Sequence, residues 1–235
     1  MRSKEFLVVV VVTMSLLWVT GCRSTSETVE LSGSSTYSQA VEELLSSAFV
    51  VEGLACQKKA TGSGFAVEKG ILTNAHVVAG TEDLHVIDHE GNQYPARIVS
   101  FDSQTDLALL DVEGVNVPSL PIAAPEIGLE GIALVGGDGM IKAIPATIDR
   151  LVDINIADIY GEGEYLRKGM QLEADISPGD SGGAIIDSSG GVVGLVFSRS
   201  SSRTGVSYAV SSEEFYLVTE NISFESVDSG ECLRK

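Results

Sequence analysis

Short apolar runs, each bounded by turn-forming residues, recur along most of the chain. They are rich in Val, Ile and Leu, and Gly, Asn, Asp or Ser separates one run from the next. Short strands at such spacing are typical of an all-β sandwich or barrel, so the predicted fold class is all-β. The predicted strands are Gly64–Val67, Ile71–Asn74, Leu84–Asp88, Ala96–Phe101, Leu107–Val112, Gly131–Val135, Ala143–Leu151, Gly183–Ile186, Val192–Phe197 and Val206–Val210.

Two segments with helical spacing flank the strands. Ser38 has the chemistry of an N-cap and precedes apolar residues spaced over 40–45, which predicts a short N-terminal helix. Near the other end, Ser211–Glu214 has the S-x-x-E spacing of a capping box, and apolar residues follow it. We therefore expect a C-terminal helix over about 212–220.

A stretch with several prolines divides the strand region in two. Pro118–Glu130 contains three of the six prolines of the chain and is followed by a fresh series of apolar runs. This stretch is the expected seam between a first half at about 48–120 and a second half at about 126–212. Both halves belong to one predicted domain, residues 38–235.

The first residues have the build of an export signal. Arg2 and Lys4 precede an apolar run, Phe6–Val19, that is too short to span a bilayer comfortably. The sequence Val19-Thr20-Gly21-Cys22 then resembles the lipobox of bacterial lipoproteins, in which a signal peptidase cuts before a diacylated cysteine. We therefore expect Cys22 to be the lipidated N-terminus of the mature protein.

The lipobox implies a signal peptide over residues 1–21 and a Ser/Thr-rich tether over residues 22–37. Cleavage at another position and retention as an uncleaved anchor helix are the alternatives. All of these interpretations export the chain. The predicted location is the bacterial cell envelope, with the domain lipid-anchored and facing the periplasm or the exterior.

The net charge restricts the partners of the protein. The chain has 33 acidic and 15 basic side chains, which gives a formal charge of −18. A surface of this sign repels phosphate backbones and anionic lipid headgroups. Nucleic-acid binding is therefore disfavoured, and the membrane is expected as a partner only through the N-terminal lipid.

Two cysteines remain besides the lipidated one. Cys56 lies near the start of the folded part and Cys232 near its end, and neither has a C-x-x-C partner. Exported thiols usually meet an oxidising environment. A disulfide between Cys56 and Cys232 would join the two ends of the domain, and two unpaired thiols are the alternative.

The most informative segment surrounds a serine. In Gly179-Asp180-Ser181-Gly182-Gly183, glycines crowd Ser181 between two predicted strands and permit unusual backbone conformations. A serine hydroxyl becomes a nucleophile when a base takes its proton, and the oxyanion formed on attack needs preorganised donors. A tight turn here directs the N–H groups of Gly179 and Ser181 toward one point.

The base and its orienting group are expected in two other segments. His76 lies in Thr73–Val78, where a strand ends and a helical turn begins, and Asp106 opens an apolar strand that would hold it rigidly. His85 and His89 are four residues apart, which would suit a metal on a helix. The surrounding alternation indicates a strand and a turn, so we expect no metal site.

Together the three segments resemble the histidine, aspartate and serine motifs of the trypsin-like serine proteases of chymotrypsin fold. In chain order they are Thr73-Asn74-Ala75-His76-Val77-Val78, Asp106-Leu107-Ala108-Leu109-Leu110 and Gly179-Asp180-Ser181-Gly182-Gly183. The HtrA-like bacterial branch fits best. The later runs Gly191–Phe197 and Gly205–Val210 extend the likeness, especially to MarP-type periplasmic protease domains, and the resemblance covers about residues 48–232.

The resemblance implies a double barrel of two six-stranded antiparallel β-barrels, with the site between them. His76 and Asp106 would come from the first barrel and Ser181 from the second. Ser181 would attack the scissile carbonyl, His76 would accept and return the proton, and Asp106 would orient His76. The N–H groups of Gly179 and Ser181 would form the oxyanion hole, and no cofactor or metal is implied.

The resemblance also implies how a substrate would bind. Leu195, Val196 and Phe197 match the strand that pairs with an extended peptide. Asp175 matches the position that selects Lys or Arg in trypsin, and a solvent-facing acid is the alternative. The family also ties the start of the domain to its end with a disulfide, which would pair Cys56 with Cys232.

The predicted function is an exported, lipid-anchored serine endopeptidase acting on cell-envelope proteins, with protein or peptide substrates in extended conformation. The alternative is a catalytically silent relative that binds an envelope protein or peptide with the same fold. In trypsin the aspartate at the position of Asp180 pairs with an N-terminus created by cleavage. The N-terminus expected here is lipidated and distant, and the sequence does not identify the partner of Asp180.

Overall fold

The computed structural model describes residues 42–233. The expected signal peptide, the lipidated Cys22, the tether and the N-cap Ser38 lie outside the described residues. Residues 42–46 are helical and belong to the predicted N-terminal helix. Within residues 42–233, no helix is both long enough and apolar enough to cross a membrane.

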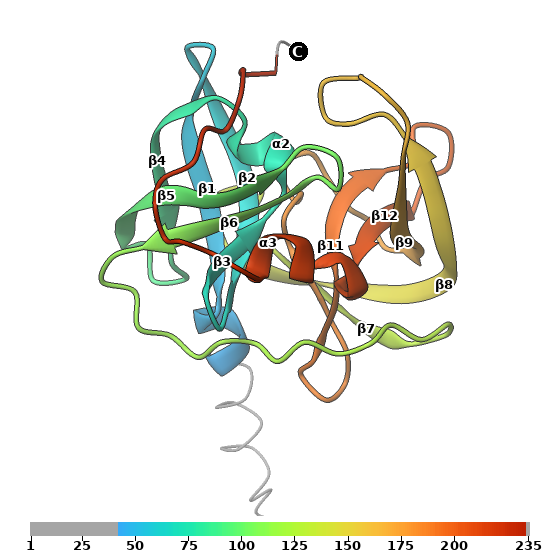
Figure 1. The fold of residues 1–235 in the computed structure, drawn as a ribbon. Coiled ribbons are helices and arrows are strands. Elements are labelled where there is room, and N and C mark those ends of the chain that lie inside the picture. Colours follow the sequence, from blue (N-terminus) through green and yellow to red (C-terminus); the bar gives the residue numbers. More distant parts are fainter. Residues whose placement is uncertain (1–41, 234–235) are drawn as a thin grey trace, which may run out of the picture.

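Two closed antiparallel β-barrels of six strands each lie side by side (Figure 1), which confirms the predicted fold class. The first barrel has the strand order β1-β2-β3-β6-β5-β4 and the second the order β10-β11-β12-β9-β8-β7. The first contains β1 (Ala48–Ala55), β2 (Lys58–Val67), β3 (Gly70–Thr73), β4 (Thr81–Ile87), β5 (Gln93–Asp102) and β6 (Leu107–Val112). The second contains β7 (Glu130–Val135), β8 (Lys142–Ile156), β9 (Tyr165–Glu173), β10 (Ala184–Ile186), β11 (Val192–Arg199) and β12 (Val206–Ser211).

The strands nearest the seam are buried on both faces. In β6, Ala108 and Leu110 belong to the apolar core of the first barrel. Leu107 and Leu109 pack on the other face, in an apolar cluster that includes residues of both barrels. A strand covered on both faces reads as a continuous apolar run rather than as an alternation. This packing places the start of β6, and with it Asp106, beside the second barrel.

Two strands complete the barrels beyond the ten predicted segments. β1 follows directly after the N-terminal helix, and β9 contains Arg167 and Lys168 where an apolar alternation would be expected. Arg167 is nevertheless buried, with 4% of its surface exposed. β9 pairs along most of its length with β8 on one side and with β12 on the other. Such pairing depends on neighbouring strands, so the apolar periodicity of the segment does not indicate it.

The predicted C-terminal helix is shorter and less regular than expected. A 3₁₀ turn, Ser212–Glu214, is followed by α3 (Tyr216–Thr219), which lies across the front of the molecule in Figure 1. The Ser211 hydroxyl accepts the N–H of Glu213 at 3.2 Å. The Glu214 carboxylate accepts the Lys168 N–H at 2.6 Å, so the reciprocal capping box does not form. The helix is held by packing instead, with the rings of Phe215 and Phe65 6.1 Å apart.

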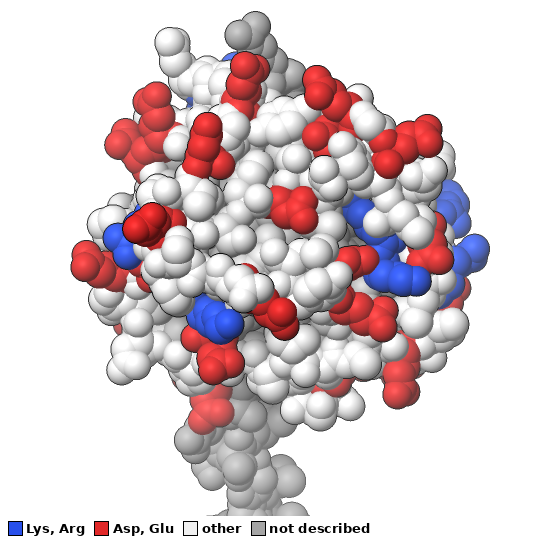
Figure 2. Space-filling view, in the orientation of Figure 1, with Lys and Arg blue, Asp and Glu red and all other residues white. Residues whose placement is uncertain are grey.

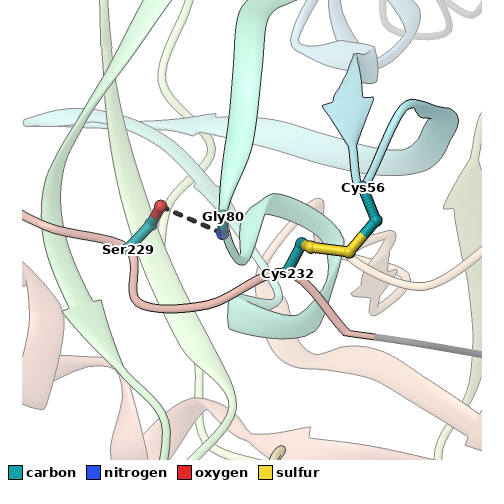
Figure 3. The surroundings of a disulfide bond; sticks show 4 residues. All are labelled: Cys56, Gly80, Ser229 and Cys232. Atoms are coloured by element: carbon teal, nitrogen blue, oxygen red, sulfur yellow. Dashed lines mark hydrogen bonds between the residues drawn. A yellow bond between two sulfur atoms is a disulfide. The ribbon is translucent and has the colours of Figure 1, made fainter.

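A disulfide joins Cys56 to Cys232 and closes the domain at its two ends (Figure 3), as predicted. The C-terminal segment crosses the first barrel to reach it. The Val227 N–H donates to the carbonyl of Ile98 at 2.9 Å, and the Gly80 N–H donates to the Ser229 hydroxyl at 3.1 Å. Gly80 follows α2 (Ala75–Val78) closely, so this segment supports the turn that carries His76.

Candidate functional site

An imidazole and a carboxylate face each other at the edge of the first barrel. His76 Nδ1 and Asp106 Oδ2 lie 2.8 Å apart, and the backbone N–H of His76 donates to Asp106 Oδ1 at 2.9 Å. Asp106 is 3% exposed. Both carboxylate oxygens therefore contact the same residue, which fixes the position of the imidazole ring.

The backbone of Asp106 is held in an uncommon conformation. Its φ of 62° lies in the left-handed region, which aspartate tolerates better than most residues. The side chain of the fully buried Asn74 donates to the Asp106 carbonyl at 2.8 Å. Asn74 also precedes α2, so one side chain links the turn that carries His76 to the loop that carries Asp106.

Ser181 lies in the loop before β10, in the second barrel. Its hydroxyl donates to the carbonyl of Phe197 at 3.3 Å. Within the described residues it makes no hydrogen bond to His76. Ser181, His76 and Gly179 nevertheless line one cleft of about 410 Å³, together with Thr61 and other residues of β1, β2 and α2. The structure thus brings the histidine and serine segments to one cleft, and the buried Asp106 contacts His76 without lining the cleft itself.

The peptide units around Ser181 have defined orientations. The Asp180 carbonyl accepts the Gly183 N–H at 3.1 Å, and the N–H of Ser181, in the same peptide unit, points the opposite way. The Asp180 N–H donates to the Ser177 carbonyl at 3.1 Å. Gly179 has a φ of 94°, in the region that favours glycine. Among residues 42–233, the N–H groups of Gly179 and Ser181 have no acceptor, which leaves both available to a ligand.

Ser63 connects the first barrel to this loop, a role that its sequence segment did not indicate. Its N–H donates to the Ser181 carbonyl at 2.7 Å, and its hydroxyl donates to the Gly179 carbonyl at 3.3 Å. The same hydroxyl accepts the N–H of Gly136 at 2.8 Å. The flanking glycines, Gly62 and Gly64, could have indicated this contact, because glycines permit two backbone segments to approach closely.

The sequence profile of the family described as "Trypsin-like peptidase domain" matches residues 62–195, which is more than half of the chain. The chain belongs to the trypsin-like peptidase family. This membership and the closed double barrel confirm the resemblance seen in the three sequence segments.

Curated relatives of this trypsin-like peptidase include bacterial proteases. "Serine protease Rv3671c" of Mycobacterium tuberculosis is 37% identical over 148 residues, which cover 60% of this chain and 37% of that protein. A "Probable periplasmic serine endoprotease DegP-like" of Halomonas elongata is 31% identical over 176 residues, covering 68% and 34%. The chain thus spans roughly a third of the length of these relatives.

Solved structures agree with the family assignment. The active form of the Rv3671c protease superposes with a TM-score of 0.78 at 30% identity, covering 83% of this chain and 89% of that chain. Its inactive form gives a TM-score of 0.64 at 29% identity, covering 74% of this chain and 88% of that one. The trypsin-like domain described here is therefore more similar to the active form.

The residues predicted to bind substrate differ in their surroundings. Leu195 and Val196 are fully buried, and both are paired with β12 inside the barrel. Phe197 lies at a register shift, where it has no partner residue in either neighbouring strand. Of these three residues, Phe197 is the one without a strand partner, and its carbonyl accepts the Ser181 hydroxyl.

Asp175 is exposed and lies outside the cleft that contains Ser181. It lines a separate cavity of about 510 Å³, together with Arg199 and Arg203. The Arg203 guanidinium donates to the Gln171 side chain at 2.7 Å. Two cations in the same cavity would disfavour a basic substrate side chain there, which supports the solvent-facing alternative for Asp175.

The surface of the trypsin-like domain is acidic, and residues 42–233 include one buried cation, Arg167, near the site. Figure 2 shows acidic side chains spread over the visible face, with few basic ones. Arg167 in β9 donates to the Ala157 carbonyl at 2.9 Å. Burial lowers the pKa of its guanidinium, and the negative charges of Asp106, Asp102 and Asp158 oppose that shift. A positive charge of the second barrel thus acts on Asp106 in the first.

The two remaining histidines have separate partners. His85 Nε2 lies 3.7 Å from Glu52, and His89 Nε2 lies 2.9 Å from Glu42. Within residues 42–233, no three His, Cys, Asp or Glu side chains gather closely enough to hold a metal ion.

Proposed function

We propose that the protein is an exported, lipid-anchored serine endopeptidase that hydrolyses peptide bonds of cell-envelope proteins through Ser181, His76 and Asp106. The observation that carries this proposal is His76, whose imidazole and backbone N–H both contact the Asp106 carboxylate and which shares one cleft with Ser181. Family membership and the protease relatives support the same reaction class.

The proton transfers follow from the contact between His76 and Asp106. A carboxylate at 2.8 Å from Nδ1 favours the tautomer that carries its proton on Nδ1, because the carboxylate only accepts. The Nε2 atom is then free to take the proton of the Ser181 hydroxyl during attack on the scissile carbonyl. His76 returns this proton to the leaving amine, and water repeats the sequence to release the acyl group.

The oxyanion of the tetrahedral intermediate needs donors that are in place before attack. The unpaired N–H groups of Gly179 and Ser181 are suited to this role, since the carbonyls around them are bonded to Gly183 and Ser63. Reorientation of the Asp180–Ser181 peptide unit would break the hydrogen bond from the Gly183 N–H to the Asp180 carbonyl. Loss of a single oxyanion donor costs about 10²–10³-fold in kcat in related chemistry.

The substrate is proposed to bind as an extended chain beside Phe197. The Phe197 carbonyl accepts the Ser181 hydroxyl at 3.3 Å, so a peptide N–H that binds this carbonyl would compete for it. Displacement of the Ser181 hydroxyl would free it to donate to His76. In this way binding of the peptide and activation of the nucleophile would be coupled.

The same hydrogen bond favours a second candidate, the silent relative that binds peptides without cleaving them. A Ser181 hydroxyl that stays on the Phe197 carbonyl has no base to take its proton. The two candidates differ in one measurable property, the reactivity of Ser181.

Covalent labelling by a fluorophosphonate probe tests the proposal on the full chain in mild detergent. We expect labelling that is lost in Ser181→Ala and His76→Ala. Ser177→Ala is the matched control, since Ser177 is an exposed serine of the same loop, and it should label like the wild type. A folded, oxidised wild type that is not labelled would refute the protease and leave the peptide-binding candidate.

Lipid anchoring is tested separately. Cys22 is proposed to carry the lipid that holds the domain at the cell envelope, with residues 22–37 as tether. Growth of a bacterial host with an alkyne-tagged fatty acid should label the wild type but not Cys22→Ser. Equal labelling of both would contradict the anchor without affecting the proposed reaction.

A further inference from the structure

The carboxylate next to the nucleophile is buried and only half satisfied. Asp180 is 1% exposed. Its Oδ2 accepts the Ser177 N–H at 2.8 Å, whereas Oδ1 has no hydrogen-bond partner within the described residues. Burying a carboxylate with one unpartnered oxygen is unfavourable, and a nearby cation would offset part of its desolvation.

Lys142, the first residue of β8, provides that cation. Its Nζ lies 3.9 Å from Asp180 Oδ1, and within residues 42–233 no other cationic group forms a salt bridge with Asp180. The same Nζ lies 3.1 Å from Asp138 Oδ2 in the preceding loop. The hydrogen bond from Lys142 lowers the pKa of Asp138. Lys142 is therefore shared between one buried and one exposed carboxylate.

The loop before Lys142 packs directly on the loop that carries the two N–H groups. A Cβ atom added to Gly137 would lie 2.7 Å from the backbone nitrogen of Asp180, so only glycine fits there. Movement of this loop or of the Asp180 side chain would therefore shift the peptide units of Gly179 and Ser181. The charge of Lys142 acts at the point where these segments meet.

We propose that Lys142 is a positioning residue, the internal counterion that holds Asp180 and thereby the N–H groups of Gly179 and Ser181. The inference rests on the proposed function, because it assigns the arrangement of the same site to an ion pair within the chain. No newly created N-terminus is then needed to neutralise Asp180.

Because Asp138 and Asp180 compete for Lys142, the proposal predicts opposite effects for removing the Asp138 charge and for removing the Lys142 charge. Asp138 is exposed and draws Lys142 toward solvent, whereas Asp180 draws it toward the active-site loop. Removal of the Asp138 charge should therefore strengthen the contact with Asp180. Removal of the Lys142 charge should leave Asp180 buried without a counterion.

The experiment compares variants of the full chain by fluorophosphonate labelling rate and by thermal unfolding midpoint. Lys142→Gln should slow labelling by about tenfold or more. This loss is smaller than that expected for a fully buried ion pair, because Lys142 is partly exposed to solvent. Lys142→Arg should restore most of the rate, and Asp138→Asn should label at least as fast as the wild type. Lys168→Gln is the matched control, because Lys168 pairs with Asp153 on the surface at 2.7 Å, and it should change neither quantity.

A double-variant cycle isolates the pair. Lys142→Gln should cost much less in an Asp180→Asn background, in both the labelling rate and the midpoint, because the buried charge is gone. Equal losses in both backgrounds would overturn the ion pair. A lower midpoint for Lys142→Gln with an unchanged labelling rate would overturn the positioning role.

Failure of the proposed protease function would give a different result from failure of the ion pair. A wild-type chain that is not labelled would refute the protease, and the positioning role with it. The coupling between Lys142 and Asp180 in the unfolding midpoints would still decide whether the ion pair exists.

Discussion

The Cys56–Cys232 disulfide offers the most direct quantitative test of the fold. The two cysteines are 176 residues apart in sequence, and their Cα atoms lie 5.7 Å apart. The chain entropy removed from the unfolded state by closing a loop of this length corresponds to about 5 kcal/mol at 25 °C. In a domain of this size each kcal/mol shifts the unfolding midpoint by roughly 2–4 °C, so loss of the bond should lower it by about 10–20 °C.

The structure also connects this bond to the site. Cys56 lines the same cleft as His76 and Ser181, and so does Leu233, the residue after Cys232. A Cβ atom added to Gly80 would overlap the backbone of Cys232, which shows how closely the C-terminal segment approaches the end of α2. Opening the bond should therefore slow fluorophosphonate labelling as well as lower the midpoint.

Circular dichroism during heating, with and without a phosphine reductant, measures the effect. The double variant Cys56→Ser/Cys232→Ser should have the midpoint of the reduced wild type, and the reductant should not change it further. A fall of less than about 5 °C on reduction would refute the loop-entropy reasoning, since it corresponds to less than half of the smallest expected shift.

Three further predictions concern single residues. Asp106→Asn should lower kcat by about 10⁴-fold with little change in KM, because the imidazole loses its orienting carboxylate. Steady-state hydrolysis of a peptide substrate measures this effect. An unchanged kcat would contradict the role assigned to Asp106. Gly182→Ala should destabilise the domain by at least about 3 kcal/mol in urea unfolding, since Gly182 has a φ of 91° and a Cβ would overlap the Ser63 carbonyl; a wild-type midpoint would contradict the described loop. Burial acts to raise the pKa of Asp187, but hydrogen bonds from Ser189 and neighbouring N–H groups, including that of Gly191, outweigh it and place the pKa below its ordinary 3.8. Because the folded-state pKa is depressed, the stabilisation is present above pH 3.8 and is lost as the pH falls through the folded-state pKa. Asp187→Asn should therefore lower the thermal midpoint at pH 7 by about 2–4 °C, with a difference that shrinks below pH 3.8, and a pH-independent difference would exclude the titration of this carboxylate as its cause.

Most of the strands and the three motif segments could be predicted from the sequence, because their signals are local. An apolar run such as Leu107–Val112 contains its own strand pattern, and the glycines around Ser181 define a tight turn without reference to the rest of the chain. The motif order then identified the family. Local signals failed for β9, where the buried charge of Arg167 interrupts the apolar pattern. They also failed where a distant segment competed for a side chain: the S-x-x-E spacing at Ser211 predicted a capping box, but Glu214 accepts the N–H of Lys168 instead.

The partners of buried polar groups were decided only by the tertiary structure. Nothing near Asp180 in sequence indicates that Lys142 lies 3.9 Å from its carboxylate, or that Ser63 binds the carbonyls of Gly179 and Ser181. The Ser63 contacts join β2 of the first barrel to the loop before β10 of the second, whereas the Lys142–Asp180 contact joins two segments of the second barrel. Their geometry therefore depends on how each barrel closes and on how the two barrels pack against each other. The sequence by itself determined which reactive side chains the protein has, because reactivity depends on residue type and tight local turns. Only the tertiary structure, through the closure of each barrel and the packing of one barrel on the other, decided which groups orient them, because a hydrogen bond or ion pair requires two distant segments to meet within a few ångströms.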